Sequence, residues 1–434
     1  MTDLTIGILA LGGMFALMLL RTPVAFAMLI TGFFGIWVVE GLRRAGAILF
    51  TETYSSVANY NLIVLPMFVL LGNIASEAGF SRALYDAAHA WVGRFRGGLA
   101  SASVIGCAAF SAVSGSSVAT AVTIGKVALP EMKRLGYADG LSTGAIAAGG
   151  TLGFLIPPST GFVLYAILTE ESIGRLFMAG ILPGLLMMLM FIAAIWLVTL
   201  RRPESGPAGE AKPFAQRIRL FLTAAPLISV IVVSIGGIYI GAFTPVEASG
   251  IGAALTALLA LGTRALSLTG FAKAVSETVR TSAMLYMIVV GANVLNPFLA
   301  LTGIPSVLGE GLTGLGLGPF GTLAVILLSY VVLGMFLDGL AMLVITVPIY
   351  YPIILALGFD PIWFGVVAVI VIEMGMITPP VGLNVFVVRS VAENVAMRTV
   401  FSGVTPFLLA MIVTLLLIIA FPQIALFIPN SMFG

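Results

Sequence analysis

Charged side chains are scarce along this chain of 434 residues. They make up 9% of it, against 60% hydrophobic residues and a mean hydropathy of +1.16, whereas soluble domains carry about 25% charged residues. Apolar segments continue from end to end, and no polar stretch is long enough to fold alone. The composition predicts an all-α integral membrane protein in the lipid bilayer. A net charge of +2 without a basic patch predicts no nucleic-acid partner.

Cysteine and histidine are nearly absent, with only Cys107 and His89 in the whole sequence. One cysteine excludes an internal disulfide and a thiolate metal cluster, and we expect a packed, inert thiol. One histidine excludes a His-rich metal site and leaves no Ser/His/Asp catalytic set. The chain also lacks a Walker A sequence, so ATP does not drive it directly. These absences predict a protein that is not an enzyme and that draws its energy from an ion gradient.

What the chain does contain, twice, is a long apolar segment broken by glycine and a Pro-Pro pair. The first reads GGTLGFLIPPSTGF (Gly149–Phe162), and the second reads VIEMGMITPPVGLNVF (Val371–Phe386). Pro157 and Pro379 lie 222 positions apart. Paired interruptions in two halves of a membrane chain point to the binding site of a transporter. Unwound backbone at membrane depth is tolerated only where it is buried in protein or lines a polar cavity.

The lengths of the apolar runs predict about ten transmembrane helices. They are expected near 4–20, 23–40, 60–78, 139–169, 174–199, 221–242, 245–262, 283–302, 362–392 and 403–428. Two further apolar stretches, 98–132 and 320–357, are interrupted at Ala112–Thr120 and Leu333–Met342. Each of them is either two full spans or one re-entrant helical hairpin, and the short polar tips favour the hairpin.

The distribution of lysine and arginine predicts the orientation, because these residues concentrate in cytoplasmic loops. With both stretches as hairpins and the N-terminus outside, only Arg43, Arg44 and Arg175 of the 20 Lys and Arg residues fall outside. The hairpins then open in opposite directions, as inverted-topology repeats require. A stretch that crosses the membrane twice returns to the side where it began, as a re-entrant hairpin does. The charge distribution therefore does not distinguish two full spans from a re-entrant hairpin.

The most hydrophilic segment, 201–219, reads RRPESGPAGEAKPFAQRIR and is predicted to be a cytoplasmic linker. The predicted division is a first inverted repeat at 1–200 with hairpin 98–132 and broken helix 139–169, and a second at 220–434 with hairpin 320–357 and broken helix 362–392. Gly41–Asn59 is predicted to form an interfacial helix, with Gly262–Arg280 as its counterpart.

Polar groups gather at the two hairpin tips and the two breaks. The first tip, Ser114–Ser117, and the first break, Gly149–Gly153, offer hydroxyls and freed carbonyls. The second tip, Gly334–Gly339, contains an aspartate, and the second break, Glu373–Pro380, contains a threonine. Hard alkali cations prefer such oxygen ligands, and half-helix N-termini suit an anionic substrate. Each half therefore has the parts for one Na⁺ site, with tight helix packing by small residues as the alternative.

Two acidic residues, Asp338 and Glu373, lie within apolar sequence and are functional candidates because intramembrane acids are energetically expensive. Asp338 is the stronger candidate, since it lies at a tip. For Glu373 the alternatives are protonation within the protein or pairing with a backbone group. Ser159 and Asn384 each closely follow a Pro-Pro pair, where a hydroxyl or an amide can bind substrate.

The SGSSVAT tip, the LGFLIPPS break, the LDG tip and the ITPPVGLNVFV break resemble the large permease (M, DctM-type) subunit of TRAP transporters, the tripartite ATP-independent periplasmic family. The resemblance covers essentially the whole chain. It implies inverted repeats and an elevator-type motion of a transport domain against a scaffold. It also implies Na⁺-coupled uptake of an organic acid across the bacterial inner membrane. The implied partners are a small four-helix membrane subunit (Q type), here a separate chain, and a periplasmic binding protein (P type).

Carried over position by position, the resemblance implies two or more Na⁺ sites and a substrate site. The first Na⁺ site would use Ser114, Gly115, Thr151, Gly153 and Pro157, and the second Gly334, Asp338, Glu373, Thr378 and Pro379. The substrate would lie between the tips, near Ser116, Ser159, Asp338 and Asn384. Two alternatives remain open, namely a stand-alone Na⁺/dicarboxylate symporter of the same superfamily and an ion channel.

Overall fold

The computed structural model describes residues 2–314, 316–392 and 394–432, and every regular element in these ranges is a helix. In chain order the helices are α1 (Asp3–Leu19), α2 (Val24–Glu40), α3 (Leu42–Ala58), η1 (Tyr60–Ile63), α4 (Val64–Glu77), α5 (Phe80–Val92), α6 (Gly98–Ser114), α7 (Ser117–Arg134), α8 (Asp139–Leu155), α9 (Thr160–Thr169), α10 (Ile173–Arg201), η2 (Pro203–Ser205), α11 (Phe214–Tyr239), α12 (Pro245–Gly262), α13 (Leu268–Thr302), α14 (Ile304–Gly314), α15 (Gly318–Gly334), α16 (Gly339–Ala356), α17 (Pro361–Ile377), α18 (Leu383–Val391), α19 (Met397–Ala420) and α20 (Gln423–Ser431).

The predicted class, an all-helical multi-pass membrane protein, is confirmed. Within the described ranges, 8 helical segments are long and apolar enough to cross a membrane. Seven of them coincide with predicted spans, and the eighth is α16, an arm of the second hairpin. The remaining predicted spans, near 4–20, 23–40 and 362–392, begin on the shorter apolar helices α1, α2 and α17.

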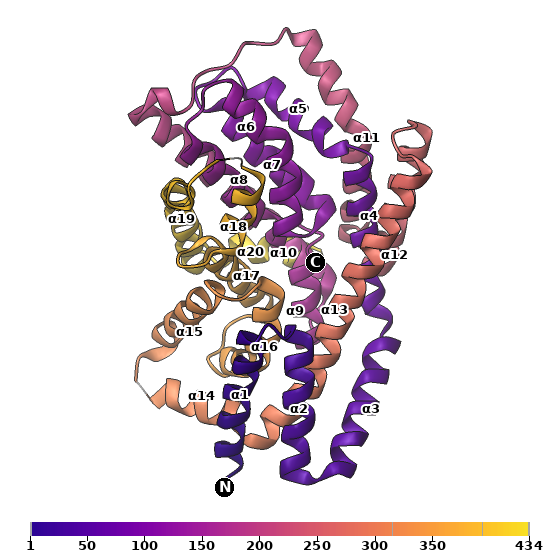
Figure 1. The fold of residues 1–434 in the computed structure, drawn as a ribbon, viewed down its shortest axis with the longest axis vertical. Coiled ribbons are helices and arrows are strands. Elements are labelled where there is room, and N and C mark those ends of the chain that lie inside the picture. Colours follow the sequence, from indigo (N-terminus) through magenta and orange to yellow (C-terminus); the bar gives the residue numbers. More distant parts are fainter. Residues whose placement is uncertain (1, 315, 393, 433–434) are drawn as a thin grey trace.

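The helices recur at the spacing of 222 residues that the sequence shows. α7 and α8 begin and end 222 positions before α16 and α17, respectively. α2, α5, α6 and α9 correspond in the same way to α12, α14, α15 and α18, with bounds that differ by at most two residues. The hairpin α6–α7 lies toward one end of the molecule and the hairpin α15–α16 toward the other (Figure 1). The boundaries at 1–200, 201–219 and 220–434 remain predictions.

The helix predicted at Gly41–Asn59 is present as α3, but its expected counterpart, Gly262–Arg280, is not a separate helix. It forms the first part of α13, which continues for 35 residues. In the first half, the Asn59 side chain accepts a 2.9 Å hydrogen bond from the Asn61 N–H, which ends α3 and starts η1. Position 281, the counterpart of Asn59, is a threonine within the helix. An asparagine competes for backbone groups in this way much more strongly than a helical threonine does.

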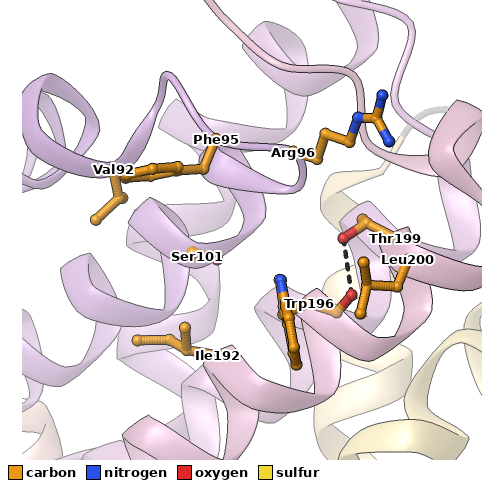
Figure 2. A pocket seen from close by; sticks show the side chains of 8 residues that line it. All are labelled: Val92, Phe95, Arg96, Ser101, Ile192, Trp196, Thr199 and Leu200. Carbon is orange, nitrogen blue, oxygen red and sulfur yellow. Dashed lines mark hydrogen bonds between the residues drawn. The ribbon is translucent and has the colours of Figure 1, made fainter.

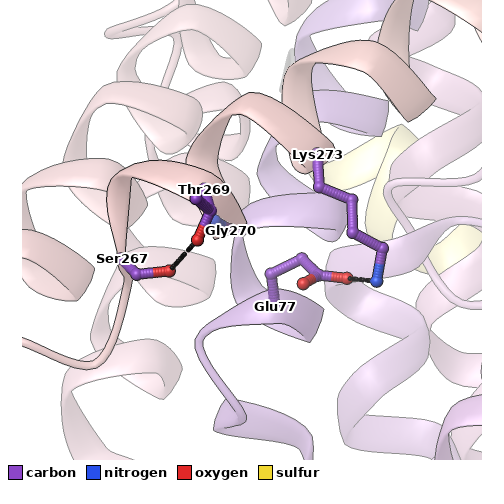
Figure 3. Close-up of polar contacts among 5 residues, drawn as sticks. All are labelled: Glu77, Ser267, Thr269, Gly270 and Lys273. Atoms are coloured by element: carbon purple, nitrogen blue, oxygen red, sulfur yellow. Dashed lines mark hydrogen bonds and ion pairs between the residues drawn. The ribbon is translucent and has the colours of Figure 1, made fainter.

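One group of packed helices contains α2, α3 and α4 together with α11, α12 and α13, and α13 contacts α2, α3 and α4 along its length. Lys273 at the start of α13 forms a 2.7 Å ion pair with Glu77 at the end of α4 (Figure 3). One turn further on, Asn73 Nδ2 donates to Thr278 Oγ1 at 2.9 Å. A small apolar cluster that includes Ile74 and Ala274 lies at the same junction.

The second group contains the hairpins, the broken helices, α10 and α19. Every residue of α17 from Ile362 to Ile377 is buried at its centre, and all of them except Glu373 are uncharged. The two halves interlock here, because α7 packs on α18 while α16 packs on α9. The short helices α5 and α14 lie between the two groups. α5 contacts α6 and α11, and α14 contacts α13 and α16.

At the segment 201–219, predicted to be a linker, α10 extends to Arg201 and α11 begins at Phe214. Backbone hydrogen bonds hold the segment between them. Gly206 O accepts from Gly97 N at 2.8 Å, and Ser205 O accepts from Ala138 N at 3.0 Å. The linker therefore binds to the loops at the base of the first hairpin.

Candidate functional site

The first hairpin tip is a tight turn between α6 and α7. Gly115 adopts a left-handed conformation with φ of 59°, which favours glycine, and Ser116 caps α7 by accepting a 3.4 Å hydrogen bond from Ala119 N. The Ser114 and Thr120 hydroxyl oxygens lie 2.7 Å apart across the turn. These contacts place the hydroxyls of Ser114 and Ser116 at the tip, as the sequence predicts.

The first tip rests directly on the first broken helix. Thr160 donates to Gly115 O through its hydroxyl at 2.8 Å and through its N–H at 3.2 Å. A Cβ added at Gly115 would lie 2.7 Å from Pro158 O, and one added at Gly153 would lie 2.5 Å from Ser116 O. Only glycines at these two positions allow such close contact between the tip and the break.

Within the first break, α8 ends at Leu155, and α9 begins after the cis peptide between Pro157 and Pro158. Ser159 caps α9 by accepting from Phe162 N at 3.3 Å, and its hydroxyl donates to Phe154 O. Thr151 Oγ1 donates to Ala148 O at 2.6 Å, within its own helix. The predicted position of the break at Gly149–Gly153 is wrong, because these residues are helical and belong to α8, and the non-helical stretch is 156–159. Gly153 and the Pro-Pro segment face the tip, whereas the Thr151 hydroxyl hydrogen bonds within α8.

The second tip rests on the second broken helix through glycine. A Cβ at Gly334 would lie 2.9 Å from Gly375 Cα. Asp338 caps α16, and its Oδ1 accepts from Leu340 N at 3.1 Å and from Ala341 N at 3.0 Å. The other carboxylate oxygen of Asp338 makes no hydrogen bond to the part of the chain that the structure describes. That oxygen is free for a ligand.

The second break has the same form as the first but is more open. The peptide between Pro379 and Pro380 is again cis, and both residues are exposed, whereas Pro157 and Pro158 are buried. Thr378 Oγ1 donates to Met374 O at 2.6 Å. Across the break, Gly382 N donates to Met335 O at 3.4 Å, which joins α18 to the second tip.

The side chain of Glu373 points to the first tip rather than to the second. Ser117 donates to Glu373 Oε1 at 2.5 Å, and Asn384 Nδ2 donates to Glu373 Oε2 at 3.5 Å. Glu373 is 1% exposed and Asn384 0%. The amide oxygen of Asn384 is buried and has no hydrogen-bond partner among the described residues. The carboxylate is therefore paired with side chains, not with a backbone group, and belongs spatially with Ser114–Ser117.

The two halves also meet around Phe154. A Cβ at Gly339, next to Asp338, would lie 3.2 Å from Phe154 Cε1, and a Cβ at Gly161 would lie 2.7 Å from Phe154 Cδ1. Two of the four predicted substrate residues, Ser159 and Asp338, therefore lie beside the same phenylalanine. Ser116 lies at the first tip, and Asn384 contacts Glu373, which accepts a hydrogen bond from Ser117 of that tip.

Thr160 and Phe154 of this junction are absent from the predicted site, and Ser117 is part of the predicted tip but not one of the predicted ligands. Ser117 occurs within the predicted tip, and Thr160 is the second residue after the first Pro-Pro pair, so the sequence indicated both hydroxyls. Nothing in the sequence distinguishes Phe154 from the other phenylalanines. The prediction that Cys107 is a packed thiol agrees with its complete burial.

The chemistry of the junction is that of hard oxygen donors and helix N-termini. It combines carboxylates, hydroxyls, an unpartnered amide oxygen and the beginnings of α7, α9 and α16. Among the described residues, no group of three or more His, Cys, Asp or Glu side chains is arranged to hold a metal ion. Such a site suits an alkali cation and an anion, rather than a transition metal.

Residues 11–424 match the family model described as the tripartite ATP-independent periplasmic transporter, DctM component. The chain belongs to this family. It is 36% identical over 380 residues to the C4-dicarboxylate TRAP transporter large permease protein DctM of Pseudomonas aeruginosa, covering 87% of this chain and 88% of that protein. The sialic acid permease SiaM of Vibrio cholerae is 32% identical, covering 88% and 89%. The ectoine permease TeaC of Halomonas elongata is 30% identical, covering 97% and 98%.

Among solved structures, the YdaH transporter of Alcanivorax borkumensis has a similar fold, with a TM-score of 0.63 at 16% identity over 89% of this chain and 90% of that chain. The predicted resemblance to DctM-type subunits is confirmed. The chain is a TRAP transporter large permease and a multi-pass membrane protein, and its relatives are named as permeases rather than as enzymes.

Proposed function

We propose that this TRAP permease couples the inward movement of Na⁺ to the uptake of an organic acid across the bacterial inner membrane. The observation that supports the proposal best is the junction of two hairpin tips with two interrupted helices. Interrupted membrane helices present backbone carbonyls to a cation and helix N-termini to an anion. Both features occur here in each half of the chain, 222 residues apart.

For the coupling ions, we keep the two predicted Na⁺ sites and extend the first. Ser114, Gly115 and Gly153 meet at the first tip, and Glu373 brings a carboxylate to the same place through its contact with Ser117. At the second tip, Gly334 and the free oxygen of Asp338 are the proposed Na⁺ ligands. They lie beside Thr378, at the C-terminal end of α17. In this proposal, Glu373 serves the first site through its side chain, although its backbone belongs to the second break.

For the substrate, the relatives are named for C4-dicarboxylates, sialic acid and ectoine, and each of these compounds carries a carboxylate group. No arginine occurs in Ser114–Ser117 or Gly334–Gly339 to bind a carboxylate in a bidentate manner, through two parallel hydrogen bonds. We propose that the N-termini of α7, α9 and α16 attract the anion, with Ser116 and Asn384 as hydrogen-bonding groups. Ser159 would join them by exchanging its present hydrogen bond to Phe154 O for one to the anion. Bound Na⁺ would offset the charge of Asp338.

For the transport step, we propose an elevator motion in which the group of hairpins and broken helices moves against the group built on α13. The packing supports this assignment, since α5 and α14 correspond by the repeat and each connects one group to the other. The ion pair of Lys273 with Glu77 and the bond of Asn73 to Thr278 lie within the α13 group, so a rigid-body motion leaves them unbroken.

The family name implies two partners, a small membrane subunit of the Q type and a periplasmic binding protein of the P type. The test is uptake into proteoliposomes that contain this chain and its Q subunit, with and without the binding protein, under an inward Na⁺ gradient. We expect uptake that requires both partners and Na⁺. Uptake by this chain alone would favour a stand-alone symporter, and ion flux far faster than substrate uptake would favour a channel.

A further inference from the structure

A long apolar groove lies between α10 and α19, away from the hairpin tips. It has a volume of about 680 Å³, and its walls include Met190, Ala193 and Leu197 from α10 and Leu409 and Val413 from α19. Arg201 closes one end. Both helices are candidate membrane spans with high hydropathy, so the groove opens toward lipid rather than toward water.

The groove has the length of one membrane leaflet. From Met190 to Arg201 the helix advances eleven residues, which is roughly 16 Å at the usual helical rise. Half the hydrocarbon core of a bilayer is about 15 Å thick. The charge distribution places Arg201 and the linker that follows it on the cytoplasmic side. The groove therefore spans the cytoplasmic leaflet.

The end of the groove at Arg201 continues into a second cavity of about 360 Å³, which is more polar than the groove. The two cavities share Val198, Arg201, Ser402 and Pro406, and the second adds Arg202 and Ser205 among its walls. Both arginines are exposed, and neither forms an ion pair within the described part of the chain. No aspartate or glutamate lines either cavity. The combined site is apolar over one leaflet and cationic at the membrane surface.

We propose that this groove binds an anionic glycerophospholipid of the cytoplasmic leaflet. An acyl chain lies between α10 and α19, and the phosphate contacts Arg201 and Arg202, with the hydroxyls of Ser205 and Ser402 as additional donors. Basic pockets between membrane helices on the cytoplasmic side are suited to anionic headgroups. A partner helix would match the apolar walls but not the unpaired cations, so the charge favours a lipid.

A cavity on another face of α10 provides a matched comparison. It has a volume of about 520 Å³ and lies between α10 and the end of α5 (Figure 2). Figure 2 shows Arg96 and Phe95 on one side and Trp196 and Ile192 on the other. This cavity contains a single cation and is not continuous with the groove at Arg201. Replacement of Arg96 therefore removes one surface arginine near α10 without changing the proposed site.

The experiment is native mass spectrometry of the purified full chain after incubation with dioleoyl phosphatidylglycerol or dioleoyl phosphatidylcholine. The variants are the double replacement Arg201→Gln with Arg202→Gln, the control Arg96→Gln, and Ala193→Trp, which fills the groove. We expect the wild type and Arg96→Gln to retain phosphatidylglycerol in preference to phosphatidylcholine. The double variant should bind phosphatidylglycerol roughly 30-fold more weakly, the loss expected for two surface cations. Ala193→Trp should weaken the binding of both lipids.

Thermal unfolding of each variant establishes that the fold is intact, as expected for exposed arginines without ion pairs. The proposal is overturned if the double variant retains phosphatidylglycerol like the wild type, or if both lipids bind equally. Loss of lipid in Arg96→Gln instead would assign the lipid to the cavity of Figure 2. Displacement of the lipid by the co-purified Q subunit would assign the groove to a protein partner. None of these outcomes depends on transport, so the lipid site and the proposed function fail or stand separately.

Discussion

Ser117 on the first hairpin donates a 2.5 Å hydrogen bond to Glu373 in the second broken helix, 256 residues further along the chain. Asn384, from the second half-helix of the same break, donates to the other carboxylate oxygen at 3.5 Å. One buried acid therefore connects the tip of the first repeat with both parts of the break in the second. A change at this position should affect both halves of the site.

Replacing Glu373 by glutamine or by alanine distinguishes the effect of its charge from the effect of its side-chain shape and hydrogen bonds. Glu373→Gln keeps a carbonyl oxygen for the Ser117 hydroxyl and should unfold near the wild-type temperature. Glu373→Ala leaves buried polar groups unpaired and should lose about 1–3 kcal/mol of stability. Ser117→Ala should cost clearly less in the Glu373→Ala background than alone, because its hydrogen bond is already gone. Thermal unfolding of the wild type, Glu373→Ala, Ser117→Ala and the double variant measures this coupling. Glu277→Gln, at an exposed position, is the control. Additive effects of the two changes would contradict the coupling.

Gly153→Ala should push the first tip away from the first break. The added methyl group would lie 2.5 Å from Ser116 O and 2.9 Å from Ser117 N, and both are backbone atoms. Overpacking of this kind costs about 1–3 kcal/mol of stability, and we expect slower uptake because the tip can no longer pack closely on the break. Gly12→Ala is the matched control, since a Cβ there meets nothing within 4 Å. Initial uptake rates in proteoliposomes provide the comparison, and equal rates for the two variants would contradict the close packing.

Much of the architecture was predictable because breaks in apolar sequence are strong local signals. The hairpin predicted at 98–132 is α6–α7, and the broken helix predicted at 139–169 is α8–α9, with α8 beginning at Asp139. Each Pro-Pro pair lies just after the end of a helix, Gly115 turns the chain at the first tip with a positive φ, and Ser116 and Asp338 have side chains that cap a helix. These local preferences determine where each helix ends, with no reference to the rest of the chain.

The partners of the buried groups were not predictable in the same way. Glu373 lies in an apolar helix, and its contact with Ser117 depends on how the two repeats pack together. Phe154 likewise acquires its place between the halves only in three dimensions. The continuity of α13 was missed because an apolar run and an interfacial segment can form one helix when no capping residue separates them.

Asp338→Asn tests whether the carboxylate is needed beyond its role as a helix cap. The amide oxygen of asparagine can still accept from Leu340 N and Ala341 N, so the protein should fold and unfold like the wild type. Uptake and its dependence on Na⁺ should fall at least tenfold, because the second carboxylate oxygen no longer carries charge to a cation.

The matched control for this change is Asp360→Asn. Asp360 caps α17 by accepting from Trp363 N at 2.9 Å, at the end of that helix opposite the break. The Asp360→Asn variant should keep full uptake. Normal Na⁺-dependent uptake by Asp338→Asn would remove Asp338 from the site and leave it as a cap alone.

Thr160→Val tests the contact between the first half-helix and the first tip. The change removes the 2.8 Å bond to Gly115 O, although the Thr160 N–H still reaches the same oxygen at 3.2 Å. We expect about 1 kcal/mol lower stability and slower uptake, both restored in Thr160→Ser. Thr414→Val serves as the control, since that buried hydroxyl bonds only within α19. If Thr160→Val and Thr414→Val behave alike, the contact has no special role at the tip.

The most direct test of the proposed Na⁺ sites is thermal unfolding of the purified chain in a series of NaCl concentrations, with KCl at equal ionic strength. An ion that binds only the folded protein raises its stability in proportion to the logarithm of its concentration once the site is filled. With Na⁺ bound at these sites, the midpoint should rise with Na⁺ but not with K⁺, and it should rise less in Asp338→Asn and in Glu373→Gln. Identical midpoints in Na⁺ and K⁺ across the series would contradict it.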